Sequence, residues 1–393
     1  MATTEERLAA LEAKLAQLTT TTPTTYYTHQ YSGEEIDAAV GRAVSGGALD
    51  TSVTNVSNQL GTFVRPNLLD NWYFGRPVDQ RRGKIIQQGV NIYTDSALTT
   101  LIGPAAYACP VVELTSTYAK VQDAKNTSSY YYAAPADVVR GYTGNRYGVD
   151  RWKSEANGIT TEIISGGITI STTAESGATE VREYFEDVIP AGTMLTISAI
   201  ISKTAASKNG VVRVTYVNGQ VGLQKSLPDR AMDYELVTLS QAATFDVKGF
   251  VFRVSNGEGY TVHAAKLELG PTQTLAHQDA DGNWVLNEVP KVGDELRECQ
   301  GYHFNSKSAQ NSAFLMRATS SSYLFGTCTF PVTMRTTPSV QLLSYRDPTT
   351  GTVITAGGVV SQITSDGFCV VYDAEKFTEG SVYQVAFSAS ADL

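Results

Sequence analysis

The sequence predicts a mostly β protein, with N-terminal coiled-coil helices, β-sandwich modules after them, and a C-terminal β-sandwich head. Leucines and valines recur at spacings of three and four within residues 1–63, as in a coiled-coil seam. Beyond Pro66 the pattern changes to short alternating runs separated by turn residues, which favours strands. Only 18% of the residues are charged, and the abundant Thr, Ser, Gly and Tyr suit strands and turns.

Length and charge narrow the possible functions. A chain of 393 residues has room for roughly two to four modules. The net charge is −9, and the densest basic cluster, Arg81-Arg82 with Lys84, is too small for a nucleic-acid site. No run approaches the roughly 18 apolar residues that cross a bilayer, and residues 1–15 lack the apolar core of a signal peptide. We therefore expect neither nucleic-acid binding nor membrane insertion.

The cysteines and histidines give no sign of a metal or a cofactor. The cysteines stand far apart without a CxxC pair, so buried free thiols in a reducing cytoplasm are the favoured interpretation. The histidines also lie apart and show no metal-binding spacing. These residues are Cys109, Cys299, Cys328 and Cys369, and His29, His263, His277 and His303.

Residues 1–63 are predicted to form a helical stalk with a linker. With Leu8 at heptad position a, Arg7 falls at g and Glu12 at e, where they meet across neighbouring chains of a parallel bundle. A single amphipathic helix docked on its own chain is the alternative, but the following TTTTPTT at 19–25 offers no core for docking. We predict a parallel homotrimer. Its seam residues are Leu8, Leu11, Leu15, Leu18, Leu49, Val53, Val56 and Leu60.

Two segments in the middle of the chain carry a family resemblance. They are NLLDNWYFGRPVDQRRG at 67–83 and GYTGNRYGVDRW at 141–152. Together they resemble a two-part signature common in phage tail fibre and receptor-binding proteins. VHAAKLELGPTQT at 262–274 is similar to the closing strand of the same module. The resemblance implies a jelly-roll sandwich over 64–277, similar to carbohydrate-binding modules.

The aromatic residues of this signature are expected to be core residues more than a sugar-binding platform, because they stand in short runs flanked by Pro and Gly. They are Trp72, Tyr73, Phe74 and Trp152. Gly166-Gly167 and Asn218-Gly219 are expected to form tight turns between strands.

An inserted segment at 89–140 separates the two halves of the signature. It predicts five short strands and resembles the small bacterial barrel of the Src-homology type, which often binds cell-wall components. A plain structural spacer is the other interpretation. Tyr130, Tyr131 and Tyr132 should alternate between the two faces of a strand, where exposed rings would suit sugar stacking or trimer packing.

Residues 278–393 are predicted to form the head. DADGNW at 279–284 fits an Asp-Gly hairpin turn and not a calcium loop, because Trp284 stands where the loop needs glycine. DELRECQGYHF at 294–304 predicts a short helix similar to the junction before phage fibre heads. The strands predicted beyond it fit one β-sandwich. They are 312–318, 323–330, 339–345, 352–356, 368–374 and 381–389.

Ligand binding is expected on loops of the head, because the stalk is N-terminal and loops on a rigid sandwich are the usual carriers of function. Amide groups suit sugar hydroxyls, and an aromatic ring beside a charge pair suits a sugar face. The candidate ligand-binding residues are Tyr345, Arg346, Asp347, Asn305, Gln310 and Asn311.

The sequence does not indicate an enzyme. Glycoside hydrolysis needs two carboxylates about 5–10 Å apart across a cleft. The densest acidic cluster, Glu183, Glu186 and Asp187, should split between the two faces of a strand. No GxSxG elbow, catalytic cysteine signature or β-helix repeat is present.

The resemblance therefore implies a phage tail fibre protein that attaches the virion to the host cell surface, by binding surface polysaccharide. Other phage tail or baseplate proteins would bind its N-terminus, and the protein would assemble in the host cytoplasm and reside in the virion. A purely structural virion component, such as a collar, whisker or baseplate part, remains the alternative. A secreted carbohydrate-binding protein is disfavoured by the missing signal peptide.

Overall fold

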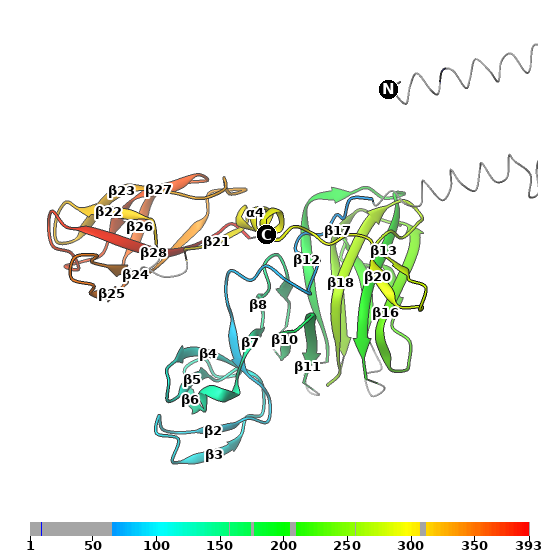
Figure 1. Cartoon of the computed structure of the whole chain (residues 1–393), viewed down its shortest axis with the longest axis horizontal. Helices are drawn as coiled ribbons and strands as arrows, with labels where there is room; N and C mark the ends of the chain where they lie inside the picture. The colour runs from blue at the N-terminus through cyan, green and yellow to red at the C-terminus, as the bar shows by residue number, and fades with distance from the viewer. Residues whose placement is uncertain are drawn as a thin grey trace, which may run out of the picture. The chain divides into compact units, whose positions relative to one another are not determined.

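The computed structural model describes residues 65–156, 158–173, 177–204, 210–255, 257–306 and 312–392, together with Ala9. The predicted seam residues from Leu8 to Leu60 lie outside the described residues, so the coiled coil and the homotrimer stay predictions. So do the roles proposed for Gln310 and Asn311. Residues Val64–Leu393 form one compact unit, and it is mostly β (Figure 1).

The first sandwich consists of two antiparallel sheets (Figure 1). Its strands have the predicted alternation, with one row of side chains in a shared core. One sheet runs in the order β16 (Met232–Ala242), β13 (Met194–Lys203), β18 (Gly259–Leu269), β11 (Gly167–Thr172), β10 (Ile159–Ile164) and β7 (Val138–Thr143). The other runs in the order β15 (Val221–Ser226), β14 (Val211–Tyr216), β17 (Val247–Ser255), β12 (Ala178–Ile189), β9 (Lys153–Ser154) and β8 (Arg146–Tyr147).

The aromatic residues of the signature fill this core, which confirms the core interpretation for three of them. Trp72, Phe74 and Trp152 are buried, and Tyr73 is half-buried. The Trp152 ring stacks on Phe252 at a centroid distance of 5.3 Å and meets the Phe74 ring edge-on at 5.2 Å. These rings join the signature loops to β17.

The predicted turns are also confirmed. Gly166 lies between β10 and β11 with φ +84°, and Gly219 lies between β14 and β15 with φ +77°. Both are conformations that glycine adopts without the steric cost of a side chain.

The inserted segment contains the five predicted strands: β2 (Asn91–Tyr93), β3 (Leu101–Pro104), β4 (Cys109–Leu114), β5 (Ala119–Gln122) and β6 (Tyr130–Ala133). A small separate core includes Ile86, Ile92 and Val121. Strand β1 (Lys84–Ile86) pairs with both β4 and β7, so the ladder of the first sheet continues into the insert. Its independence as a folding unit stays a prediction.

A β-hairpin spans the predicted boundary between the first sandwich and the head, at residues 277 and 278. Strands β19 (Ala276–Gln278) and β20 (Trp284–Leu286) pair across the Asp-Gly turn, where Gly282 has φ +84°. This confirms the hairpin interpretation of DADGNW. Trp284 and Leu286 pack against the core of the first sandwich.

The head has a second core, made by one eight-stranded sheet that includes the C-terminal strand. The expected helix is α4 (Val292–Gln300), and it ends before His303, because His303–Asn305 (β21) pairs with β28. Strands β21 and β26 (Val359–Thr364) were not predicted, since β26 lacks an alternating apolar row. The predicted strands are β22 (Leu315–Ala318), β23 (Tyr323–Thr329), β24 (Ser339–Arg346), β25 (Val353–Thr355), β27 (Gly367–Tyr372) and β28 (Val382–Ser390).

All four cysteines are free thiols, as expected; Cys109, Cys299 and Cys328 are buried and Cys369 is partly exposed. Across the described ranges, no group of three or more His, Cys, Asp or Glu side chains could hold a metal ion. None of the helices described is long and apolar enough to span a membrane.

The aromatic core generates a stability prediction. Replacing Trp152, whose side chain is 1% exposed, by alanine should lower the free energy of unfolding by about 3–5 kcal/mol, because it leaves a large cavity. Urea denaturation followed by circular dichroism measures this change. The partly exposed Trp284→Ala is the matched control and should cost about 1 kcal/mol. Equal losses for the two variants would contradict the assigned core.

Candidate functional site

The structure corrects the prediction that Tyr345 presents its ring in a surface turn. Tyr345 lies in β24, its side chain is 0% exposed, and its ring meets the Phe377 ring at 5.0 Å. The cause is a β-bulge, because Leu342 pairs with Phe387 while Ser344 already pairs with Ala386. The extra residue inverts the alternation, so that Leu342 and Tyr345 both point into the core.

The neighbouring candidates take part in strand and turn structure. Arg346 is half-buried, and its Nη1 donates to Oε1 of Gln384 at 3.0 Å. Asp347 accepts the backbone N–H of Thr349 at 2.8 Å, and this hydrogen bond is the largest cause of the lowered pKa of Asp347. Asn305 lies in β21, paired with Ser388. At the four described candidate positions, the structure therefore shows no cluster of exposed ligand-binding groups.

A different surface of the head does expose aromatic side chains. We call it the outer aromatic face. It is formed by the side chains of β28, β22, β23, β27 and β26 that point away from the core of the head. Tyr323, Phe325 and Tyr372 are 43%, 47% and 42% exposed. The Tyr323 ring lies 5.0 Å from the Tyr372 ring and 6.4 Å from the Phe325 ring. The outer aromatic face comprises Leu315, Arg317, Tyr323, Phe325, Val359, Tyr372 and Val382.

Strand register places these residues next to one another. Tyr323 pairs with Tyr372, which in turn pairs with Val359. In the adjacent row, Phe325 and Val382 both pair with Arg317. An antiparallel sheet with one face on a core normally carries polar residues on the other face. A contiguous apolar patch on that other face marks an interaction surface.

The segment YLFGTCTF is a strand, as predicted, and its two faces differ in their surroundings. Leu324 points into the core, whereas its neighbours Tyr323 and Phe325 point to the opposite face and are exposed. The sequence signal for an exposed aromatic face is therefore that apolar residues occupy both alternating positions of this strand. A strand that is apolar on both faces is either buried on both sides or offers one side to a partner. The order of strands in the sheet determines whether the second side is buried or available to a partner, and this order cannot be predicted from the sequence.

A second feature is a cavity of 530 Å³ where β12 meets residues following α4. Arg151 is one of the residues that line it. The Arg151 Nε donates to Oδ2 of Asp70 at 2.8 Å, and the Tyr302 ring lies 3.5 Å from the guanidinium. Glu183 is buried, and its Oε1 lies 3.6 Å from Nη2 of Arg151. Glu186 is exposed and pairs with Arg335 at 2.8 Å, and both Glu183 and Glu186 line this cavity.

Burial sets the protonation of two carboxyl groups near this cavity. It raises the pKa of Glu183 well above its usual value. The Oε2 atom of Glu183 has no hydrogen-bond partner within the described part of the chain, which fits a neutral carboxyl group. Burial also raises the pKa of Glu295 on α4 to about 7. These groups bind protons more tightly in the folded than in the unfolded chain.

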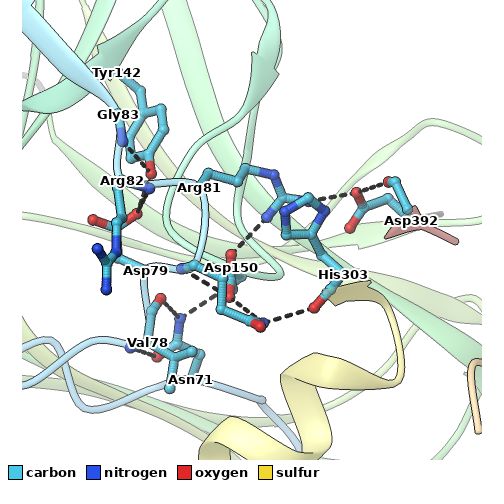
Figure 2. A network of polar contacts seen from close by, with 12 residues as sticks. Asn71, Val78, Asp79, Arg81, Arg82, Gly83, Tyr142, Asp150, His303 and Asp392 are labelled. Carbon is cyan, nitrogen blue, oxygen red and sulfur yellow. Dashed lines mark hydrogen bonds and ion pairs between the residues drawn. The ribbon is translucent and has the colours of Figure 1, made fainter. Parts of the chain in front are cut away.

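A polar network connects the signature loops with the end of the chain (Figure 2). Arg81 forms ion pairs with both Asp150, at 2.7 Å, and Asp392. Asn71 donates its side-chain amide to the carbonyls of Val78 and Asp150. Burial lowers the pKa of His303 in this network to about 3. Within the described residues, both ring nitrogens of His303 and Oδ1 of Asp392 have no hydrogen-bond partner, while the ion pairs of Arg81 join the signature loops to the end of the described chain.

Comparison with known proteins gives no family for this chain. No protein-family model matches the sequence, and no curated relative matches it. Among solved structures, similarity extends to the tailspike protein 4 enzymatically active domain of bacteriophage CBA120, with 14% identity and a TM-score of 0.25. That match covers 30% of this chain and only 19% of the tailspike chain.

Isolated carbohydrate-binding modules are also similar. BiXyn10A CBM1 has 14% identity and a TM-score of 0.24, with 33% of this chain and 88% of that chain covered. The family 11 carbohydrate-binding module of Lic26A-Cel5E from Clostridium thermocellum has 17% identity and a TM-score of 0.23, with 34% and 98% covered. Likenesses of this size assign neither family nor ligand.

The raised pKa of Glu295 predicts a pH dependence of stability. A carboxyl group whose folded pKa is raised contributes stability below its unfolded pKa of 4.5, and this stability is lost as the pH rises through about 7. Between pH 5 and pH 8, Glu295 should therefore lower the free energy of unfolding of the wild-type protein by on the order of 1 kcal/mol, after allowance for solvent screening. The variant Glu295→Gln should not show this decrease. Urea midpoints of both proteins across this range measure the difference.

Two features of the design isolate Glu295. His303, with its lowered pKa, acts in the opposite sense at acid pH but is present in both proteins. The control is Glu235→Gln. Arg230 lowers the pKa of Glu235, so this variant should still lose stability as the pH rises toward 8. Parallel pH profiles for wild type and Glu295→Gln would contradict the assignment.

Proposed function

We propose that this chain is a phage tail fibre protein that attaches the virion to surface glycans of its host, and that the outer aromatic face of the head makes the contact. The observation that carries the proposal is the exposure of three ring-bearing side chains on one sheet face beside Arg317. The resemblance of residues 67–83 and 141–152 to phage fibre proteins supports the virion setting.

The chemistry of the face suits a sugar ligand. Aromatic rings stack on the apolar face of a sugar ring, and a flat sheet presents several such rings in fixed positions at little cost in conformational entropy. Arg317 lies between Phe325 and Val382 in register and supplies hydrogen-bond donors for hydroxyl or carboxylate groups. Attachment of this kind requires no cleavage of a glycosidic bond.

Homotrimerisation through the seam from Leu8 to Leu60 belongs to the same proposal. Three identical heads on one stalk would convert a weak single contact into firm adsorption, since each bound head raises the effective concentration of the others.

A purely structural virion part is the second candidate function. One observation favours it: Leu315, Val359 and Val382, on the same face, are 52%, 63% and 41% exposed. Aliphatic side chains suit packing against protein better than stacking on sugar. In that case the outer aromatic face would be a contact between copies of this chain or with another virion protein.

Adsorption of the fluorescently labelled full-length protein to candidate host cells tests the proposal. The double variant Tyr323→Ala/Tyr372→Ala should adsorb at least about 10-fold less, because each lost stacking contact removes on the order of 1 kcal/mol, and avidity multiplies the loss over three heads. Phe245→Ala, just before β17, is the matched control, since Phe245 is 39% exposed and lies outside the head and the insert. Removing surface glycans from the cells should abolish wild-type adsorption.

The same variants separate the two candidate functions. Unchanged adsorption by the double variant, together with a smaller mass in light scattering, would assign the face to contacts between copies. Reduced adsorption with an unchanged mass supports glycan binding by the head.

A further inference from the structure

A serine and a histidine meet on the outer side of the first sandwich. Ser202 lies on β13 and His263 on the neighbouring β18, and the Ser202 Oγ is 2.8 Å from the His263 Nε2. The other ring nitrogen, Nδ1, lies 2.8 Å from the carbonyl oxygen of Gly166. Both side chains are partly exposed.

The carbonyl of Gly166 determines the tautomer of His263. A carbonyl oxygen only accepts hydrogen bonds, so Nδ1 must carry the proton and donate it. In the neutral ring Nε2 is then an acceptor, and the Ser202 hydroxyl donates to it. This is the arrangement in which an imidazole acts as general base toward a serine hydroxyl, with a third group orienting the ring.

The backbone around the pair is irregular on both sides. In β18, His263 is the extra residue of a bulge, because Ala264 pairs with Ile200 and Val262 with Ile201. On the other side of β13, the register with β16 also shifts next to Ser202. β-bulges recur beside active sites, where they re-aim a side chain.

Tyr234 in β16 completes the arrangement. It has φ +52°, a strained value for a residue with a side chain. In this conformation its backbone N–H donates to the Ser202 Oγ at 2.9 Å, and its ring lies 4.7 Å from the His263 ring. The N–H stabilises negative charge developing on the serine oxygen, and the ring restricts rotation of the imidazole.

A groove opens next to the serine. Its volume is 620 Å³, and Ser202 lines it together with Lys203, Asp233, Glu235, Thr169 and Thr261. Polar side chains of this kind suit a substrate rich in hydroxyl groups.

We propose that Ser202 is a nucleophile and His263 its general base in the cleavage of acyl esters. The Ser202 Oγ bonds to the ester carbonyl carbon while its proton passes to the His263 Nε2. The bond from this carbon to the alcohol oxygen then breaks, and His263 returns the proton to the leaving alcohol. Water next attacks the acyl-serine with proton transfer to His263, which releases the carboxylic acid and restores the serine.

The expected substrate is a short acyl group esterified to a hydroxyl of a polar compound such as a glycan. Only this choice of alcohol rests on the proposed glycan-binding function. The cleavage step itself is independent of it, because removal of an acyl group leaves glycosidic bonds intact and uses no residue of the outer aromatic face.

The first test uses the unaltered full-length protein and a fluorophosphonate, which phosphonylates activated serines. Peptide mass spectrometry should find the adduct on Ser202. His263→Gln should lose the adduct, whereas His277→Gln, at an exposed histidine bonded to Asn287, should retain it. Absence of an adduct on Ser202 in the folded wild-type protein would overturn the proposal.

Hydrolysis of p-nitrophenyl acetate is the second test. Ser202→Ala and His263→Gln should each lower the rate about 100-fold or more, the usual contribution of a positioned general base. Ser361→Ala, at an exposed serine of β26, is the control and should leave the rate unchanged. Equal rates in all these proteins would contradict the proposal, while adsorption to host cells reports separately on glycan binding.

Discussion

Arg81 pairs with two carboxylates from distant parts of the sequence, and this contact links the first sandwich to the head. Asp150 lies in the second half of the signature, and Asp392 follows the last strand of the head. The Asp150 side chain is 1% exposed, and burial raises its pKa to about 7, so removal of Arg81 would leave a buried carboxyl group without its ion-pair partner. The signature loops therefore serve as a joint: their aromatic residues belong to the first core, and their polar residues bind the end of the second.

The first sandwich and the head, which is one eight-stranded sheet and not the predicted two-sheet sandwich, differ in their free surfaces. In the first, much of the outer surface of β13 and β18 is covered, and even Lys266 is fully buried, with its Nζ 2.8 Å from Oε1 of Glu288. In the head, the sheet has its core on one side, and the outer aromatic face carries unpaired apolar side chains. This difference is the reason that we propose attachment through the head, while the first sandwich has its irregular backbone around Ser202.

Local patterns predicted most elements but not the sites. The alternation of apolar and polar residues in strands, and turn glycines such as Gly219, depend only on neighbours in the sequence. The strands and turns that they specify could therefore be predicted. Tyr345 was misplaced because a bulge opposite β28 inverts its direction, and a bulge depends on the partner strand. The Ser202–His263 pair joins residues 61 apart, and the contact of Arg81 with Asp392 joins residues 311 apart. Only the strand order brings such residues together.

Hydrogen–deuterium exchange of the full-length protein tests the central claim most directly. The protein is compared with and without polysaccharide extracted from cells to which it adsorbs. Binding at the outer aromatic face should slow amide exchange in β22, β23 and β27, and leave β12, β13 and β18 unchanged. Protection confined to the first sandwich or to the inserted segment, with none in these three strands of the head, would contradict the assignment of attachment to the head.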